Sequence, residues 1–419
     1  MFDFALRRDT PIIQSLLDRD FYKDTMGQLI FLKYPKVPVK FVFKNRTDGI
    51  RLAEEIDIHE LDEQLKYCRT LRVNNSEEHY MRGTNEYQDR MFDEPYLQFI
   101  RGYSLPDYEL TVQSDGQIGW EVANDWPMAS PWETIFLAVV NELYYRNKLR
   151  KMTRFERDAL FSEGVKKLEW KIKLLRQYPE IKFTDFGTRR RFSSLWQKYV
   201  VEVMQTELPN QLVGTSNTLL AMQLGLLPMG TSAHEMYMGL YGIMHDSDER
   251  ILASHNQTIK DWWEQYGFGL SIALTDTYGS DFFFRDFTLE QARLWKGLRH
   301  DSGDPFIFGE KAIKFYQNIG IDPKEKMVVF SDGLDVNTII ALWVRFHDRI
   351  KVSFGWGTNL TNDLGLPSLS MVVKLLESCG ISTVKLSDNL AKAMGSKPEL
   401  SRSTRIFGYL NKESQACIY

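Results

Sequence analysis

The pattern of apolar and polar positions changes at about residue 181. Before it, residues 37–47 (VPVKFVFKNRT) alternate like a strand, which predicts a β-strand with Val37, Val39, Phe41 and Phe43 on one face. Residues 54–71 have helical spacing, and residues 107–124 predict a hairpin whose turn is Ser-Asp-Gly. A long apolar segment that runs into a helix follows at 131–152. This part of the chain is therefore predicted to be mixed α and β.

After residue 181 one unit recurs: a short apolar run ends in a cluster of Asp, Gly, Thr, Ser, Arg or His, and an amphipathic stretch follows. Seven such ends occur, KFTDFGTRRRF, QLVGTSN, LLPMGTSAHE, LSIALTDTYGSD, WKGLRHDSGDP, MVVFSDGLD and KVSFGWGTN. Repeated strand-then-helix units predict a parallel sheet, and seven units favour a closed or nearly closed α/β barrel over an open sheet. Because barrel sites form at the carboxyl ends of the strands, all seven polar clusters are expected on one rim.

Two further strands are predicted near the carboxyl end of the chain, in MVVKLLES (371–378) and TVKLSDN (383–389). Both contain the β-branched residues that favour strands. They could return to pair with the amino-terminal sheet.

Composition and charge narrow the class of protein. The 419 residues are 43% hydrophobic and 26% charged, which is typical of a globular protein, and the length suggests two or three domains. Lys and Arg number 52 against 56 Asp and Glu, so the net charge of −4 predicts no nucleic-acid partner and no membrane partner. Three scattered cysteines, the lack of a signal-peptide core and the lack of a membrane-length apolar stretch predict a cytoplasmic protein with reduced thiols.

The predicted rim carries groups that bind anions. Gly355, Gly357 and Thr358 in FGWGTN would let backbone N–H groups approach a phosphate, although a plain glycine turn is an equally good interpretation. The segment SDGLD adds Asp332 and Gly333, which suit either ribose hydroxyls or a helix cap.

Arginines and aspartates are densest in GTRRRF and GLRHDSGDP. Arg189, in the first, has the planar guanidinium that binds phosphate or carboxylate through two hydrogen bonds. In the second, Asp301 or Ser302 could simply cap a helix. A cap does not explain the Arg-His-Asp run that begins at Arg299, so this run is a candidate site.

His234, in PMGTSAHE, has three interpretations. A neutral histidine could cap the next helix. Metal ligation is disfavoured because no HxH or HxxxH pair flanks the residue. A ring nitrogen could also accept a phosphoryl group as a nucleophile, and a rim rich in phosphate-binding groups makes that interpretation reasonable.

Nine strings occur together and in order: LLDRDFYKDTM, DFGTRRRF, VGTSN, PMGTSAHE, ALTDTYGSDFF, GLRHDSGDP, FSDGLDV, FGWGTNLTND and VKLSDN. With their spacing, they resemble the nicotinate phosphoribosyltransferase family over about residues 10–400. The resemblance implies a type II phosphoribosyltransferase fold, an irregular α/β barrel beside a β-rich α+β domain built from the two chain ends. The implied limits are 131–369 for the barrel and 1–130 plus about 370–419 for the second domain.

The resemblance also implies a reaction. Nicotinate would be joined to the ribose of phosphoribosyl pyrophosphate, giving nicotinate mononucleotide and pyrophosphate in NAD salvage. ATP would be a co-substrate, hydrolysed through a transient phosphohistidine at His234. Mg²⁺ would be bound through pyrophosphate, with no direct protein ligand, and the protein is expected to be a homodimer.

Site residues follow from the same resemblance. The implied catalytic residues are His234, Arg299 and Asp301. The implied nicotinate-binding residues are Phe186, Thr231, Ser216, Arg299 and a Tyr22 that reaches in from a partner subunit. The implied residues for phosphoribosyl pyrophosphate are Arg189, Asp276, Asp332, Gly333, Gly355, Gly357 and Thr358. Trp356 stands where the family carries a small aliphatic residue in its phosphate loop.

Three rival functions stay open. A nicotinamide-using relative would want an acidic acceptor near position 216, where this chain has Ser216. A non-catalytic phosphometabolite-binding protein would not need the His, Arg and Asp set. A barrel glycosidase would need two facing acids, which Asp276, Asp301 and Asp332 could imitate, but the Arg-rich rim fits phosphate better.

Overall fold

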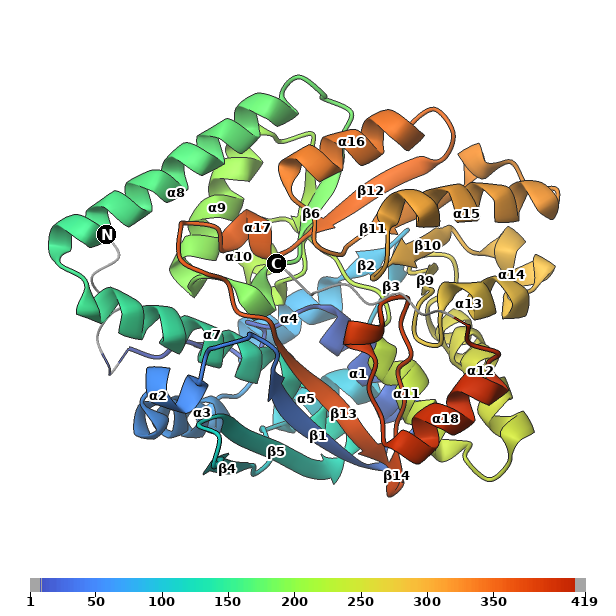
Figure 1. Cartoon of the computed structure of the whole chain (residues 1–419), viewed down its shortest axis with the longest axis horizontal. Helices are drawn as coiled ribbons and strands as arrows, with labels where there is room; N and C mark the ends of the chain where they lie inside the picture. Colours follow the sequence, from blue (N-terminus) through green and yellow to red (C-terminus); the bar gives the residue numbers. More distant parts are fainter. Residues whose placement is uncertain (1–7, 9, 411–419) are drawn as a thin grey trace.

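Seven short strands form one parallel sheet at the centre of the molecule (Figure 1). The computed structural model describes residue 8 and residues 10–410. The strand order in the sheet is β8-β7-β6-β12-β11-β10-β9. The strands are β6 (Phe183–Asp185), β7 (Leu212–Thr215), β8 (Leu227–Pro228), β9 (Ile272–Leu274), β10 (Gly297–His300), β11 (Met327–Phe330) and β12 (Lys351–Trp356). Each of the seven predicted apolar runs is one of these strands.

The sheet curls into the irregular barrel that the strand count predicted. Neighbouring strands pair in parallel along the whole order, and β8 and β9 stand at its two ends, so the ring of hydrogen bonds stays open among the described residues. Every strand in a parallel sheet ends at the same edge. All seven polar clusters therefore meet on one rim.

Helices follow the strands. They are α9 (Ser194–Glu207), α10 (Thr218–Leu224), α11 (His234–Ile243), α12 (Asp248–Tyr266), α13 (Ser280–Asp286), α14 (Leu289–Leu294), α15 (Pro305–Asn318), α16 (Val336–Phe346) and α17 (Thr358–Thr361). In α15, Ala312, Ile313 and Tyr316 are buried, as helical spacing predicts for one apolar face. Asp304 caps this helix by accepting hydrogen bonds from the backbone N–H groups of Phe306 and Ile307.

The two chain ends meet in a second, antiparallel sheet of order β14-β13-β1-β5-β4. Its strands are β1 (Pro38–Asn45), β4 (Glu109–Val112), β5 (Ile118–Asp125), β13 (Met371–Ser378) and β14 (Ile381–Ser382). Val39, Phe41 and Phe43 of β1 are buried, which confirms the predicted apolar face. The predicted hairpin is β4–β5, with Gly116 at φ 79° in its turn. The exact limits of a separate domain remain a prediction.

The helices before α8 come from the amino-terminal third. They are α1 (Tyr22–Lys33), α2 (Leu52–Glu55), α3 (Ile58–Thr70), α4 (Asn75–Gly83), α5 (Glu94–Gly102), α6 (Trp126–Ala129) and α7 (Trp132–Lys151). The long helix α8 (Arg154–Leu175) packs on the barrel helices α9 and α16, and α18 (Lys397–Ile406) packs on α12. A small hairpin, β2 (Asn85–Glu86) and β3 (Asp89–Arg90), lies between α4 and α5. The segment 131–152, predicted as buried and helical, is α7. No helix among the described residues combines the length and apolarity that crossing a bilayer requires.

One predicted strand is wrong. MVVKLLES is β13, but in TVKLSDN only Lys385 makes a β-bridge, an isolated one to Met394. The segment leaves the antiparallel sheet instead. The backbone N–H of Leu386 donates to the carbonyl of Thr277 on the barrel rim, 2.8 Å away. Hydrogen bonds to the barrel thus replace the sheet bonds that a strand would have made, and they bring Lys385 to the rim.

Candidate active site on the barrel rim

A cavity of about 170 Å³ opens where the barrel strands end and the antiparallel sheet covers them. Its lining includes seven Arg and Lys side chains against four Asp and Glu side chains. Such a balance favours anionic ligands. The predicted site residues that line it are Tyr22, Phe186, Arg189, His234, Arg299, Asp301, Asp332, Gly333, Gly357 and Thr358.

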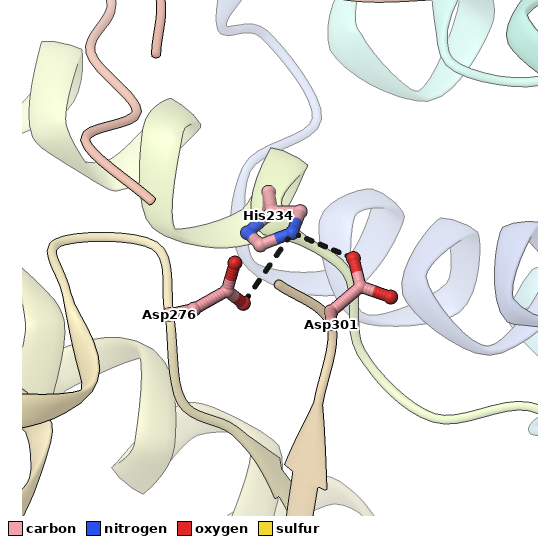
Figure 2. Close-up of side chains that lie close together, drawn as sticks. All are labelled: His234, Asp276 and Asp301. Atoms are coloured by element: carbon pink, nitrogen blue, oxygen red, sulfur yellow. Dashed lines mark hydrogen bonds and ion pairs between the residues drawn. The ribbon is translucent and has the colours of Figure 1, made fainter. Parts of the chain in front are cut away.

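His234 is the first residue of α11 and lies between two aspartates that follow β9 and β10 (Figure 2). Its Nε2 is 3.1 Å from Oδ2 of Asp301 and 3.7 Å from Oδ1 of Asp276. Its Nδ1 is 2.9 Å from the hydroxyl of Thr277. The imidazole is thereby held at both nitrogens, at the positive end of a helix dipole. An added negative group on this ring would be stabilised there.

The ring of His234 is neutral near pH 7. Burial, followed by the nearby ammonium of Lys385, lowers the pKa of His234 to about 4, although Asp276 and Asp301 act in the opposite direction. The pKa of Asp301 stays well below its usual range, because Arg299 and His234 outweigh the effect of burial. A neutral imidazole leaves one ring nitrogen unprotonated, and this nitrogen has the electron pair that a nucleophile needs.

His234, Asp276 and Asp301 also form a cluster that could in principle hold a metal ion. The ammonium of Lys385 already lies there, with Nζ 2.7 Å from His234 Nε2 and 3.5 Å from Asp276 Oδ2. A divalent cation in the same place would face that charge at close range. The residues present therefore do not fit a directly bound metal ion, and the binding of Mg²⁺ through pyrophosphate stays a prediction.

Phe186 and Arg299 form one wall of the cavity. The guanidinium of Arg299 lies 5.7 Å from the centre of the Phe186 ring. Arg299 donates to Ser331 Oγ and to Asp301 Oδ1, each at 2.9 Å. Asp185, which ends β6, holds the turn before Phe186 by accepting from the backbone N–H of Gly187 at 2.8 Å. A flat aromatic face thus stands beside a fixed guanidinium.

Tyr22 and Arg189 form another part of the wall. Arg189 donates to the Tyr22 hydroxyl at 3.1 Å, and its Nε is 3.1 Å from Asp20 Oδ2. Burial raises the pKa of Asp20 to about 6 in spite of Arg189. Tyr22 lines this cavity in its own chain, and a contribution from a partner subunit stays a prediction.

The phosphate-binding segments predicted from glycine lie on the same cavity. Gly333 has a φ of 60°, which only glycine adopts readily, in the turn after β11. Gly357 precedes α17, whose first residue is Thr358. Asp332 receives a hydrogen bond from Lys392 Nζ at 2.6 Å. Backbone N–H groups, a hydroxyl and a paired carboxylate are therefore available to a phosphorylated sugar.

Gly355 lies behind Phe186, outside the cavity lining. A Cβ at this position would come within 2.4 Å of two ring carbons of Phe186, so the glycine makes room for the ring. Trp356 is fully buried and packs edge-to-face on Phe183 at 5.7 Å. Its side chain is not among the residues that line the cavity.

We expect Gly355→Ala to lower the free energy of unfolding by about 1–3 kcal/mol, because the added methyl overpacks against the Phe186 ring. Chemical denaturation with fluorescence detection measures the change. Gly83→Ala, at the exposed end of α4 with open space around its Cβ, is the control and should not lose stability. An equal, small effect of both substitutions would contradict the packing argument.

Besides Gly355, three predicted residues do not line the cavity. Asp276 is buried and contacts His234 and Lys385. Ser216 is buried, and its hydroxyl donates to Asp20 Oδ1 at 2.5 Å. Thr231 is half-buried in the loop before α11. Their roles as ligand-binding residues stay predictions.

Lysines from the end of the chain are the main group that sequence reasoning missed. Lys374 of β13, Lys385 and Lys392 all line the cavity. Burial, then Lys385 and Arg46, hold the pKa of Lys374 well below its usual range. The string VKLSDN, which contains Lys385, is one of the family strings and was the available signal. Because the segment was predicted to be a strand of the antiparallel sheet, Lys385 was not predicted to lie on the barrel rim.

The fold is a parallel α/β barrel, and a cavity rich in Arg and Lys lies where its strands end. The protein therefore belongs to the class of α/β-barrel proteins whose site lies at the carboxyl ends of the strands. The N-terminal domain model of the nicotinate phosphoribosyltransferase (NAPRTase) family matches residues 17–141, and the model of the family itself matches residues 181–411. The chain therefore belongs to the nicotinate phosphoribosyltransferase family.

Solved structures agree with this assignment. A nicotinate phosphoribosyltransferase from Vibrio cholerae is similar with a TM-score of 0.84 and 31% identity, over 96% of each chain. One from Porphyromonas gingivalis is similar with a TM-score of 0.83 and 30% identity, over 95% of this chain and all of that chain. The fold is thus shared with these proteins over 95–96% of this chain.

Proposed function

We propose that this protein is a nicotinate phosphoribosyltransferase that forms nicotinate mononucleotide and pyrophosphate from nicotinate and phosphoribosyl pyrophosphate in NAD biosynthesis. ATP hydrolysis drives the reaction through a transient phosphohistidine at His234. One observation carries the proposal: a neutral, nucleophilic imidazole at a helix N-terminus opens onto the same cavity as an aromatic and guanidinium wall and the glycine-rich strand ends.

Nicotinate binds between Phe186 and Tyr22, with its carboxylate on Arg299. Phe186 and Arg299 are 5.7 Å apart, ring centre to guanidinium, which suits a flat pyridine ring that carries a negative group beside it. Ser216 lies next to Asp20, whose pKa is raised by burial, and takes no part in the cavity surface. Thr231, half-buried in the loop before α11, completes the residues proposed for nicotinate.

Phosphoribosyl pyrophosphate lies along Arg189, Asp332, Gly333, Gly357 and Thr358, all of which line the cavity. Asp276, which contacts His234 and Lys385, and Gly355, which lies behind Phe186, complete the residues proposed for this substrate. Mg²⁺ would arrive bound to the pyrophosphate and would supply neutralisation of its negative charge. The cavity's own cations stabilise the departing pyrophosphate in the same way, and preorganised charges of this kind are effective because they need no rearrangement during reaction.

His234 attacks the terminal phosphorus of ATP, and the bond from that phosphorus to ADP breaks. Asp301 orients the ring through Nε2 at 3.1 Å, and Thr277 holds Nδ1 at 2.9 Å. The phosphoryl group adds roughly −1.5 to −2 charge, by analogy with other phosphorylated side chains. This charge attracts the cations of the rim and tightens the site around phosphoribosyl pyrophosphate. The two states of His234 must bind the substrates differently for ATP to drive the reaction.

Further features belong to the proposal. The protein acts as a homodimer in the cytoplasm, with no nucleic-acid or membrane partner, in keeping with its net charge of −4. The barrel domain spans 131–369, and the second domain combines 1–130 with about 370–419.

We expect the purified protein to release pyrophosphate from phosphoribosyl pyrophosphate when nicotinate is present, and to do so faster with ATP. Nicotinamide should be turned over far more slowly, because it brings no carboxylate to Arg299. Pyrophosphate release and nucleotide product, measured with each base and with and without ATP, test both points. Equal turnover of the two bases would favour the nicotinamide-using rival, and no pyrophosphate with either base would favour the non-catalytic one.

A further inference from the structure

One lysine behind the cavity wall holds two carboxylates that line the cavity. Lys23 is fully buried, and its Nζ lies 2.6 Å from Glu133 Oε2. It also donates to Glu235 and, at 3.2 Å, to Ser130 Oγ. An ammonium has three N–H donors, so all three are used. Glu133 and Glu235 raise the pKa of Lys23 despite the opposing effect of burial, and the side chain stays charged.

Three helices meet at this ammonium through their first turns. Lys23, Glu133 and Glu235 are each the second residue of their helix, in α1, α7 and α11 respectively. Acidic residues are favourable in a first turn, but a lysine there opposes the helix dipole. The two carboxylates offset that cost. The arrangement therefore ties α1 to both other helices at their amino-terminal ends.

Lys23, Glu133 and Glu235 form a charged triad. Two of the helix starts that this triad joins also carry residues of the proposed site. Lys23 directly follows Tyr22, and Glu235 directly follows His234. The other oxygen of Glu133 is 3.6 Å from Arg189, which in turn bonds the Tyr22 hydroxyl. A continuous path of contacts thus runs from the phosphoryl-accepting end of the site to the pyridine-binding end.

Stability alone does not account for this triad. Burying three charges has a large desolvation penalty, and apolar side chains of similar volume often stabilise a fold as well or better. Trp126 adds a further constraint, since its Nε1 donates to Glu235 Oε1 at 2.7 Å. Lys23 and Trp126 together fix the side chain of Glu235, and hence the position of the neighbouring His234. Fixing this position explains the buried charges better than a gain in stability does.

We infer that Lys23 is a positioning residue that couples the state of His234 to nicotinate binding. The inference rests on the proposed function. When His234 gains a phosphoryl group, any shift of the first turn of α11 is transmitted by Glu235 to Lys23. From there it reaches Tyr22 through α1 and Arg189 through Glu133. Lys23 itself does not line the cavity, so it acts through these residues and not on the substrate.

The test compares Lys23→Met, which removes the charge, with Lys23→Arg, which keeps it. Lys33→Met is the matched control, because Lys33 lies on the same helix and also pairs with two acids, Asp261 and Glu264, but is part-exposed and away from the cavity. The measurements are the KM for nicotinate with and without ATP, the nucleotide formed per ATP hydrolysed, and acid-labile phosphate on the protein.

For Lys23→Met we expect the KM for nicotinate to rise about tenfold with ATP and clearly less without it, a size typical of coupling between sites. Nucleotide formed per ATP should fall while acid-labile phosphate still forms. Lys23→Arg should recover part of the loss, and Lys33→Met should match the wild type.

Equal changes with and without ATP, or no change in nucleotide per ATP, would overturn the inference, because a purely structural role predicts them. If Lys23→Met fails to fold, Glu235→Gln replaces it, with the same expected split and the same overturning result. Wild-type protein that transfers nothing to nicotinate would refute the proposed function and the coupling with it. Active wild type with an unaltered Lys23→Met would refute the coupling alone.

Discussion

His234→Ala should lose the stimulation by ATP and keep a slow, ATP-independent transfer to nicotinate. The methyl side chain cannot accept a phosphoryl group, so ATP can no longer change how the rim binds its substrates. We expect the rate with ATP to fall about tenfold or more, to the level without ATP. Initial rates of nucleotide formation with and without ATP measure this directly.

His59→Ala is the control for this substitution, because His59 is exposed on α3 and its side chain pairs with the exposed Glu63 at 3.5 Å. Phosphorylation with γ-labelled ATP should leave acid-labile label on the wild type and on His59→Ala, and none on His234→Ala. Full ATP dependence in His234→Ala would show that another residue carries the phosphoryl group.

Arg299→Ala should raise the KM for nicotinate by roughly a hundredfold, because two charge-assisted hydrogen bonds to the carboxylate would be lost. The KM for phosphoribosyl pyrophosphate should change far less. Arg299 holds Ser331 and Asp301 at 2.9 Å, so a smaller loss in kcat is also expected as Asp301 loses its partner. Steady-state kinetics with each substrate varied in turn give both KM values.

Arg299→Lys separates charge from geometry, because lysine keeps the charge but cannot form the planar, two-bond contact. It should restore only part of the affinity for nicotinate. Arg345→Ala, which removes an exposed arginine paired with Glu310, is the control for surface charge and should behave like the wild type. A similar rise in both KM values for Arg299→Ala would count against a carboxylate clamp.

The barrel could be predicted from the sequence because each of its strand-then-helix units is marked by residues that are neighbours in the chain. Each strand is a short apolar run, each polar cluster follows directly, and the parallel arrangement places all strand ends on one edge. His234, Arg299 and Thr358 are far apart in the chain, yet their positions after strands were enough to predict that they share a cavity. The β1 face and the β4–β5 hairpin were predictable for the same reason.

Contacts between distant segments were not predictable in this way. Lys385 was assigned to a strand from its apolar neighbours, but hydrogen bonds to the barrel draw its segment out of the sheet and place its ammonium 2.7 Å from His234. Tyr22 lines the cavity of its own chain, a position that the resemblance did not predict. Gly355 makes room for the Phe186 ring, a packing role that the glycine pattern did not reveal, and its part in phosphate binding stays a prediction.

The sequence by itself determined the class of fold, which strand each polar cluster follows, and which chemical groups lie on the rim. It could do so because hydrophobic periodicity and turn residues act over only a few positions. Only the tertiary structure decided which charges pair: Lys385 with His234 and Asp276, Lys392 with Asp332, and Lys23 with two glutamates from other helices. Such pairs join residues more than fifty positions apart. Their partners depend on how the helices and the two sheets pack, and no local pattern carries that information.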